Sequence, residues 1–177
     1  MVNGFHGDTE LNFNVVYHDK NMPRLCHVGG YNKSDFIDLY CVSATVTHTD
    51  GTVEEFKDNW EEFSYEQGAI VFVSFGISIE LNDENGKQYT ALVYPRSSLF
   101  KKTGLFMTNS TGIIDNSYNS NKDVWMGMML AMRCGTIKKY QRLAQFTVVE
   151  KSPKLKFKEV EDLGHEERGN FGSTGDK

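Results

Sequence analysis

The residues best equipped for chemistry lie near the end of the chain, in the run RGNFGSTG. Arg168 offers a planar fork of donors that fits a phosphate group. Glycines such as Gly172 allow backbone N–H groups to curl around an anion. Ser173 and Thr174 add hydroxyl donors, and Phe171 adds a flat apolar face. This combination predicts a lid over a nucleotide polyphosphate, and the alternative is a disordered glycine-rich tail.

A second group of donors follows Pro95. Arg96, Ser97 and Ser98 stand where a short helix, expected over 97–104, begins. Serine at the start, lysines near the end and a glycine after them support this helix. Free N–H groups and the helix dipole favour anions at such a point. The stretch therefore predicts a phosphate-binding corner, unless it is an ordinary helix cap beside a surface arginine.

A hairpin-like run, NSTGIIDNSY, spans positions 109–118. The side-chain amide of Asn109 and the exposed backbone can read the edge of a pyrimidine. The carboxylate of Asp115 can take a proton from water. The alternative is a polar hairpin in which Asp and Asn satisfy their own turn.

Two strand residues complete the set of candidates. Asp38, in SDFIDLY, is a carboxylate on a strand with one apolar face. Outside an active site, such a residue is a solvated strand position or an ion-pair partner of an arginine. Gln145, in QRLAQF, is uncharged between Ala144 and Phe146, so it either faces inward or takes an outward strand position. The histidines show no metal-ligand spacing, and no nucleophile elbow or phosphate-loop motif is present.

Composition narrows the class of protein. The chain has 177 residues with 39% hydrophobic content, which suits one compact domain with a tail. A formal net charge of −5 argues against non-specific binding to nucleic acid. Cys26, Cys41 and Cys134 form no CxxC pair, which indicates reduced thiols in a cytoplasmic protein without a zinc site. The polar first residues exclude a signal peptide, and no apolar run is long enough for a membrane span.

Short strands are expected to position these candidates. The expected strands cover 11–17, 34–48, 53–56, 69–81, 88–94, 105–108, 112–114, 124–133, 141–149 and 155–160. Many short strands with almost no helix predict an all-β sandwich or barrel. Positions 124–133 are apolar in both alternating sets, which predicts a strand covered on both faces, with its methionines in the core or at a subunit contact. Positions 58–65 remain unassigned.

Taken in order, the five stretches resemble the motifs of the trimeric dUTP pyrophosphatase (dUTPase) family. SDFIDLY, PRSSL, NSTGIIDNSY, QRLAQF and RGNFGSTG follow the family's order from about residue 34 to 175. The resemblance implies a distorted jelly-roll-like β-barrel, also called β-clip, with one short helix and a flexible C-terminal tail. The β domain would cover 1–160, and the linker and lid 161–177. The chain would form a homotrimer in which the tail of one chain closes a site built by the other two.

The same resemblance implies an activity. The expected reaction hydrolyses dUTP to dUMP and pyrophosphate, which limits uracil incorporation into DNA and supplies dUMP. Mg2+ would be held by the triphosphate, with no direct protein ligand. Asp115 would be the base that activates water, and Asp38 would lie near the waters of the metal or near the arginine.

The remaining roles implied by the resemblance concern substrate binding. They are as follows: Arg96, Ser97 and Ser98 hold the phosphates with Gln145 beside them; Asn109 and the backbone of Gly112, Ile113 and Ile114 read uracil; Tyr118 excludes a 2′-hydroxyl; Arg168 meets the γ-phosphate; Phe171 covers the uracil; and Gly172, Ser173 and Thr174 complete the lid.

The chain departs from the family pattern in three places. Asp35 and Phe36 replace an Ala-Gly pair, the fifth motif is two residues short, and a longer loop follows Tyr118. That loop leaves Trp125 as a candidate to support the base. Two alternatives stay open: a relative of dCTP deaminase, which shares the fold, and a nucleotide-binding regulator with little or no catalysis.

Overall fold

The fold is seen in a computed structural model that describes residues 10–30 and 33–165. Strands and one short helix account for its regular structure. In chain order they are β1 (Val15–Tyr17), β2 (Ile37–Tyr40), β3 (Ser43–Thr47), β4 (Val53–Phe56), β5 (Glu62–Tyr65), β6 (Ile70–Ser74), β7 (Ile77–Ile79), β8 (Tyr89–Pro95), α1 (Leu99–Thr103), β9 (Leu105–Met107), β10 (Gly112–Ile114), β11 (Met126–Ala131), β12 (Gly135–Lys138) and β13 (Arg142–Glu150). The predicted all-β class with one short helix is confirmed.

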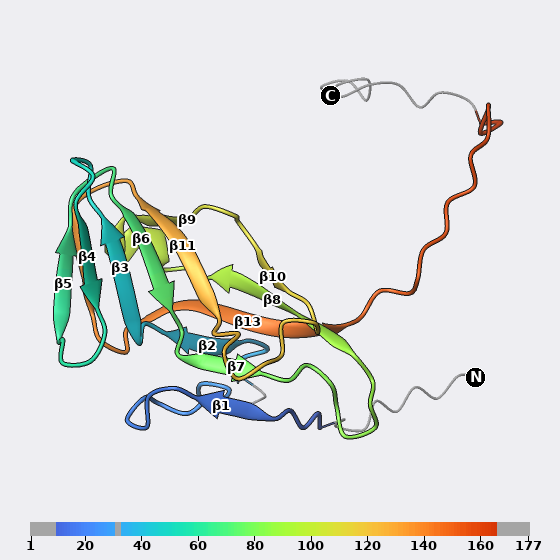
Figure 1. Cartoon of the computed structure of the whole chain (residues 1–177), viewed down its shortest axis with the longest axis horizontal. Helices are drawn as coiled ribbons and strands as arrows, with labels where there is room; N and C mark the ends of the chain where they lie inside the picture. The colour runs from blue at the N-terminus through green and yellow to red at the C-terminus, as the bar shows by residue number, and fades with distance from the viewer. Residues whose placement is uncertain (1–9, 31–32, 166–177) are drawn as a thin grey trace.

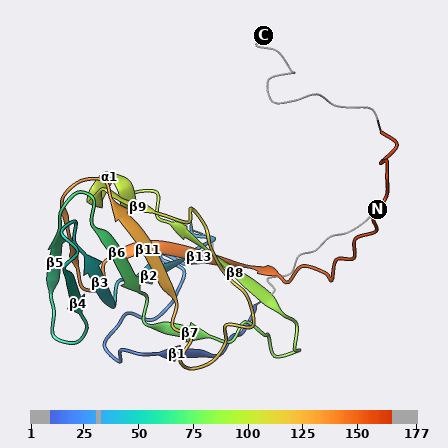
Figure 2. The ribbon, with the colours of Figure 1, turned by 45° about the horizontal axis from the view of Figure 1, so that its top comes forward.

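Two larger sheets form the body of the molecule. One has the strand order β10-β8-β13-β2, and the other has the order β4-β3-β6-β11-β9. Two-stranded sheets, β1-β7 and β12-β5, complete the fold, and every strand pairing is antiparallel. Figure 1 shows these sheets wrapped around one interior, and Figure 2 shows α1 close to β9 at the top. The arrangement is jelly-roll-like, and its strands lie in open sheets rather than in one closed barrel.

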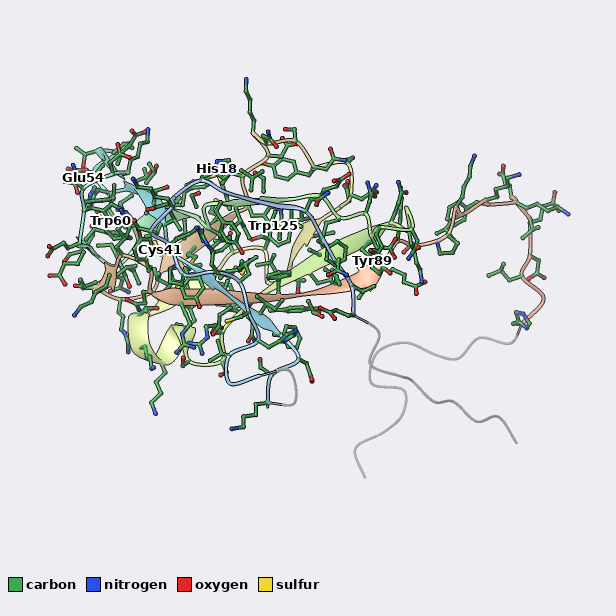
Figure 3. The ribbon with its side chains drawn as sticks, turned by 90° about the horizontal axis from the view of Figure 1, so that it is seen from below. His18, Cys41, Glu54, Trp60, Tyr89 and Trp125 are labelled. Atoms are coloured by element: carbon green, nitrogen blue, oxygen red, sulfur yellow. The ribbon has the colours of Figure 1, made fainter. Side chains whose placement is uncertain are left out.

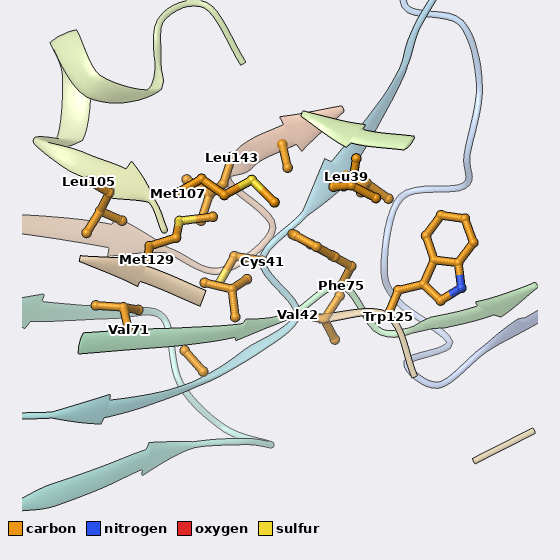
Figure 4. Packing of buried hydrophobic residues seen from close by; sticks show 14 of the residues in the cluster. Leu39, Cys41, Val42, Val71, Phe75, Leu105, Met107, Trp125, Met129 and Leu143 are labelled. Carbon is orange, nitrogen blue, oxygen red and sulfur yellow. The ribbon is translucent and has the colours of Figure 1, made fainter. Parts of the chain in front are cut away.

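Apolar side chains from both larger sheets meet in a single core. Leu39, Phe75, Trp125, Met129 and Leu143 are fully buried there. Figure 4 shows Leu39, Met129 and Leu143 on strands of the two sheets, and Phe75 and Trp125 beside strand ends, around the same interior. Burial of such side chains is the main favourable term that holds the sheets together.

The stretches 34–48 and 69–81, each expected as one strand, are in fact two strands each. The first turns from β2 into β3 at Val42, and the second turns from β6 into β7 at Gly76. Gly76 has a φ of 65°, and a Cβ built there would lie 2.7 Å from a γ-carbon of Val42. The two corners therefore touch, and only glycine fits the second one. Figure 4 shows Val42 and Phe75 together at this point.

The unassigned stretch 58–65 contains a strand. β5 pairs with β12 and buries Phe63 and Tyr65. Phe63 also stacks on Phe56 at a centroid distance of 4.7 Å, and Trp60 packs beside both rings. The aromatic residues of this segment thus close one end of the core.

Within a single chain the methionine-rich strand is covered on one face only, and the expectation that its methionines lie at a subunit contact stays a prediction. On β11, Met129 and Ala131 are buried, whereas Met126 is 53% exposed and Met128 is also exposed. Phe72 on the neighbouring β6 lies opposite Met128 and is exposed as well. One face of the five-stranded sheet is therefore apolar and open to solvent in a single chain.

The strand expected over 155–160 is absent, because β13 ends at Glu150 and no strand is assigned from 151 to 165. This segment, the arm, runs away from the body in Figures 1 and 2. Its lysines alternate with apolar residues as in a strand, but within residues 10–30 and 33–165 no strand pairs with it. Phe157 is 91% exposed and Leu163 is 80% exposed.

Candidate active site

A buried carboxylate organises one end of the four-stranded sheet. Asp38 on β2 is 6% exposed, and both of its oxygens are paired. The Arg96 Nε forms an ion pair with Oδ1 at 2.7 Å, and an Arg142 terminal nitrogen donates to Oδ2 at 2.9 Å. Burying a carboxylate costs free energy of desolvation, and the two guanidinium groups offset that cost by pairing with it. Asp38 is thus the ion-pair partner that the sequence left as an alternative.

Arg96 and the two serines after it lie at the end of β8, at the same end of the sheet. The Arg96 backbone N–H donates to the Leu143 carbonyl at 3.2 Å, which ties this corner to β13. Ser98 occupies the N-cap position of α1, but its side chain makes no capping hydrogen bond, contrary to expectation. Ser97 is exposed. Gly104 ends the helix with a left-handed φ of 74°, as predicted.

Gln145 joins this corner through the sheet. It lies on β13 directly between Asp38 on β2 and Tyr94 on β8. Ala144 and Phe146 are buried, so Gln145 takes the opposite, outward face and is partly exposed. We call Asp38, Arg96 with its two serines, and Gln145 the phosphate corner, because the guanidinium, hydroxyl and amide donors suit an anion and Asp38 holds the guanidinium in place.

A separate hairpin carries the pyrimidine-reading candidates. Asn109 is exposed in the turn between β9 and β10, and Ser110 has a left-handed φ of 53°. Gly112 lies close against β8, because a Cβ built there would be 3.2 Å from Val93 Cβ. Ile113 is 70% exposed and Ile114 is partly buried. The backbone of this hairpin is therefore presented outward.

Asp115 follows the end of β10 in an exposed turn. Its Oδ1 accepts the Ser117 backbone N–H at 2.8 Å and the Ser117 hydroxyl at 2.5 Å. The hydroxyl bond, then the backbone bond, hold the pKa of Asp115 below its usual value, and the positive charge of Lys151 lowers it further. Asp115 is therefore ionised near neutral pH and can accept a proton.

The loop after Asp115 is held by its own hydrogen bonds. The Tyr118 N–H donates to the Asp115 carbonyl at 3.2 Å, and the Tyr118 hydroxyl donates to the Val124 carbonyl at 3.2 Å. The Asn119 side-chain amide donates to the carbonyl of buried Asn116 at 2.9 Å. Tyr118 nevertheless remains 42% exposed.

A single chain does not bring the phosphate corner close to Asp115 and the hairpin. Ile114 pairs with Ala91 near the start of β8, whereas Arg96 follows the other end of that strand. Arg96 lies five positions after Ala91, which is roughly 17 Å at about 3.3 Å per residue. Asp115 and the phosphate corner therefore lie at opposite ends of β8. Figure 3 shows Tyr89, the first residue of β8, near the end of the body where the arm leaves.

The candidates of the last motif lie outside the described residues. These are Arg168, Phe171, Gly172, Ser173 and Thr174. Their roles stay predictions.

The structure adds two residues that were not singled out from the sequence. Arg142 pairs with Asp38 across β2 and β13, a contact that depends on strand register. Ser117 bonds Asp115, and a serine two positions after an aspartate was a usable signal for such a turn. Trp125, the candidate to support the base, is buried in the core, edge-on to Phe146 at 5.1 Å (Figure 3), and its role stays a prediction.

The described residues offer neither a metal cluster nor a membrane-spanning helix. Among residues 10–30 and 33–165, no cluster of three or more His, Cys, Asp or Glu side chains has the geometry to hold a metal ion. None of the helices in the same part of the chain is long and apolar enough to cross a bilayer.

Comparison with known proteins gives one consistent result. A family model described as dUTPase matches residues 61–175. A prophage-derived deoxyuridine 5'-triphosphate nucleotidohydrolase of Bacillus subtilis (strain 168) is 38% identical over 117 residues, which are 66% of this chain and 80% of that protein. The deoxyuridine 5'-triphosphate nucleotidohydrolase of a Hydrogenobaculum strain is 40% identical over 111 residues, which are 60% of this chain and 72% of that protein.

Solved structures support the fold. The dUTPase of Streptococcus mutans has a TM-score of 0.56 at 22% identity, over 81% of this chain and 98% of that chain. The dUTPase of Staphylococcus bacteriophage 80alpha, solved with dUpNHpp, has a TM-score of 0.60 at 18% identity, over 93% of this chain and 98% of that chain. A dUTPase mutant of phage phi11 of S. aureus, whose structure reveals a coordinated structural Mg(II) ion, has a TM-score of 0.60 at 15% identity, over 87% and 99%.

Proposed function

The chain belongs to the dUTPase family, and on that premise we propose that it hydrolyses dUTP to dUMP and pyrophosphate as a homotrimer with shared active sites. The observation that carries the shared site is the separation of Asp115 from the phosphate corner along β8. A base must reach its water within hydrogen-bond distance of the reacting phosphate. Roughly 17 Å along one strand forbids this within one chain. The phosphate corner of one subunit must therefore face the hairpin of another.

Asp115 is the general base of this mechanism. Ser117 occupies its Oδ1, so Oδ2 is the atom that takes a proton from water. The resulting hydroxide attacks the α-phosphorus, and pyrophosphate leaves. Holding the pKa of Asp115 low keeps the carboxylate ionised before each turnover.

The phosphate corner binds the leaving pyrophosphate. Asp38 fixes the Arg96 guanidinium through its Nε, which leaves the terminal nitrogens of Arg96 to meet the phosphates. Ser97 and Ser98 add hydroxyls, and Gln145 adds an uncharged amide beside them. Spreading the substrate's negative charge over such donors lowers the barrier to attack. Mg2+ on the triphosphate, as the family implies, supplies further charge neutralisation.

The hairpin selects the nucleotide. Asn109 and the backbone of Gly112, Ile113 and Ile114 read the edge of uracil, and Tyr118 packs against the deoxyribose. Their exposure in the single chain leaves this surface available for the base. Because uracil and thymine present the same polar edge, rejection of thymine must come from steric exclusion of its methyl group.

Two apolar surfaces of the single chain favour assembly. The open face of the five-stranded sheet exposes Phe72, Met126 and Met128, and the arm exposes Phe157. Contiguous apolar surface of this kind marks protein contacts. We assign residues 1–160 to the catalytic domain and 161–177 to a linker and lid, with Arg168, Phe171, Gly172, Ser173 and Thr174 closing a neighbour's site. The cytoplasm, where dUTP is used, is the proposed location.

The test is a single substitution followed by product analysis. Asp115→Asn should bind the non-hydrolysable analogue dUpNHpp like the original chain and nearly stop pyrophosphate release from dUTP. Undiminished turnover in this variant would remove the assignment of the base. In the original chain, binding without product would indicate a regulator, and ammonia from dCTP would indicate a deaminase. Deleting residues 166–177 should keep the trimer and abolish most activity, which separates the lid from assembly.

A further inference from the structure

Ser117 engages Asp115 more closely than the other residues that the structure describes. Its backbone N–H and its hydroxyl both donate to Oδ1, at 2.8 Å and 2.5 Å. A carboxylate oxygen has two lone-pair sites, so these donors saturate Oδ1. In the described part of the chain, no hydrogen bond to Oδ2 is found. The two oxygens of one carboxylate thus have different surroundings.

The segment that carries Ser117 is fixed on both sides. The Tyr118 N–H closes a turn onto the Asp115 carbonyl at 3.2 Å. Asn116 is buried between them, and its carbonyl accepts the Asn119 amide at 2.9 Å. The backbone that carries the serine hydroxyl is therefore tied by hydrogen bonds on both sides of Ser117.

The two hydrogen bonds from Ser117 matter because Asp115 is exposed. The terminal torsion of an aspartate is broad, so a free carboxylate on a surface turn rotates readily. Reaction needs the accepting oxygen at one position relative to water and phosphate. Anchoring one oxygen removes that rotational freedom and fixes the direction of the other.

We propose that Ser117 is a positioning residue, whose hydroxyl locks Oδ1 of Asp115 and thereby aims Oδ2 at the attacking water. This rests on the proposed role of Asp115 as the base. The charged group that acts on Asp115 from another element is Lys151, at the start of the arm, and its side chain donates to the Gln88 amide oxygen at 2.8 Å. Removing the Ser117 hydroxyl leaves Lys151 in place, so the two influences can be separated.

The test compares Ser117→Ala with Ser117→Thr, which keeps a hydroxyl. For Ser117→Ala we expect kcat for dUTP to fall by about 10-fold to 100-fold with KM unchanged, because misdirection of a reacting group costs up to about that much. The acid limb of the kcat–pH profile should move to higher pH, because a donor that favours the ionised carboxylate is lost. Ser117→Thr should restore both values.

The outcomes separate this proposal from the proposed function. An unchanged kcat or an unchanged acid limb in Ser117→Ala overturns the positioning role, as does an equal loss in Ser117→Thr. If Asp115→Asn keeps its turnover, the role of the base fails first and the positioning role fails with it. Lys151→Gln serves as the matched control, since it should shift the acid limb upward without the loss of kcat. Binding of dUpNHpp and the size of the trimer show that each variant is folded.

Discussion

Two inactive variants should restore each other's activity if the active site is shared. Asp115→Asn removes the base, and Arg96→Ala removes the guanidinium of the phosphate corner. The Arg96 variant should still fold, because Asp38 keeps its 2.9 Å bond to Arg142. In the shared site, Asp115 comes from one chain and Arg96 from another, so a mixed trimer can hold an intact site although no chain carries both residues.

The size of the recovery follows from chance assembly. With equal amounts of the two variants, a site has an intact base in half of the cases and, independently, an intact corner in half, so about one quarter of sites are native in a symmetric trimer. Purification through both tags discards the trimers made of one variant, and each mixed trimer has one native site of its three, so we expect about a third of the original kcat per site in the purified trimers. Without sharing, every site lacks one residue and recovery is zero.

The assay uses co-expressed variants with different tags, purified through both tags in sequence, and measures pyrophosphate release. A mixture of Asp115→Asn with Asp115→Ala is the matched control, since neither chain supplies a base. If doubly tagged trimers form and show no more activity than either variant alone, the shared site is refuted. The separation of Asp115 from Arg96 along β8 would then not require two chains to build one site.

Three further predictions concern stability. Asp38→Asn leaves its two arginines without a buried counter-charge and should lower the free energy of unfolding by about 3 kcal/mol, the low end for a buried pair because both arginines reach solvent; urea unfolding at fixed protein concentration would contradict this with a loss below about 1 kcal/mol. Gly76→Ala should lower the free energy of unfolding by about 2 to 4 kcal/mol, because the positive φ strains an alanine and its Cβ overpacks against Val42. Gly86→Ala, where φ is a similar 76° but the space is open, should lower it by only about 1 kcal/mol. The His48–Glu66 pair, at 2.8 Å, predicts a weakly acidic stability optimum. The hydrogen bond to Glu66 raises the pKa of His48, so its contribution is full below about 6.5 and is lost as pH rises through the raised value. Bonds from the Thr49 N–H and from His48 lower the pKa of Glu66 to about 2, so its contribution is present above 4.5 and is lost as pH falls toward about 2. A curve of Tm against pH should lose its alkaline decline in His48→Gln, and an identical curve would show that the pair contributes nothing.

The chemistry of the site could be predicted further than its geometry. Residue types and their order along the chain pointed to a phosphate corner, a hairpin and a base, because donors and carboxylates have fixed preferences. The Asp38 contact with Arg142 could not be predicted, because it depends on the register between β2 and β13 and on the irregularity beside Arg142. Register is set by pairing of strands far apart in sequence.

The fold was predictable in class but not in its corners. The stretches 34–48 and 69–81 keep one apolar pattern while they pass from one sheet to the next, since both parts remain buried. Hydrophobic periodicity cannot reveal such a change of sheet. Gly76 was the one local signal, and its meaning depends on Val42, a residue distant in sequence. In the same way, the alternation around Phe157 is typical of a strand, but it finds no partner strand among the residues that the structure describes.

The difference between the two halves of the site explains why assembly would matter for catalysis. The Asp38 cluster is already buried in a single chain, so its arginine is oriented before substrate arrives. Asp115 and Tyr118, by contrast, are exposed to solvent. A carboxylate in bulk water gains little from oriented charges, because water screens them. Covering the hairpin with a neighbour's corner and a third chain's lid would exclude that water, so the trimer would supply the low dielectric that the single chain lacks.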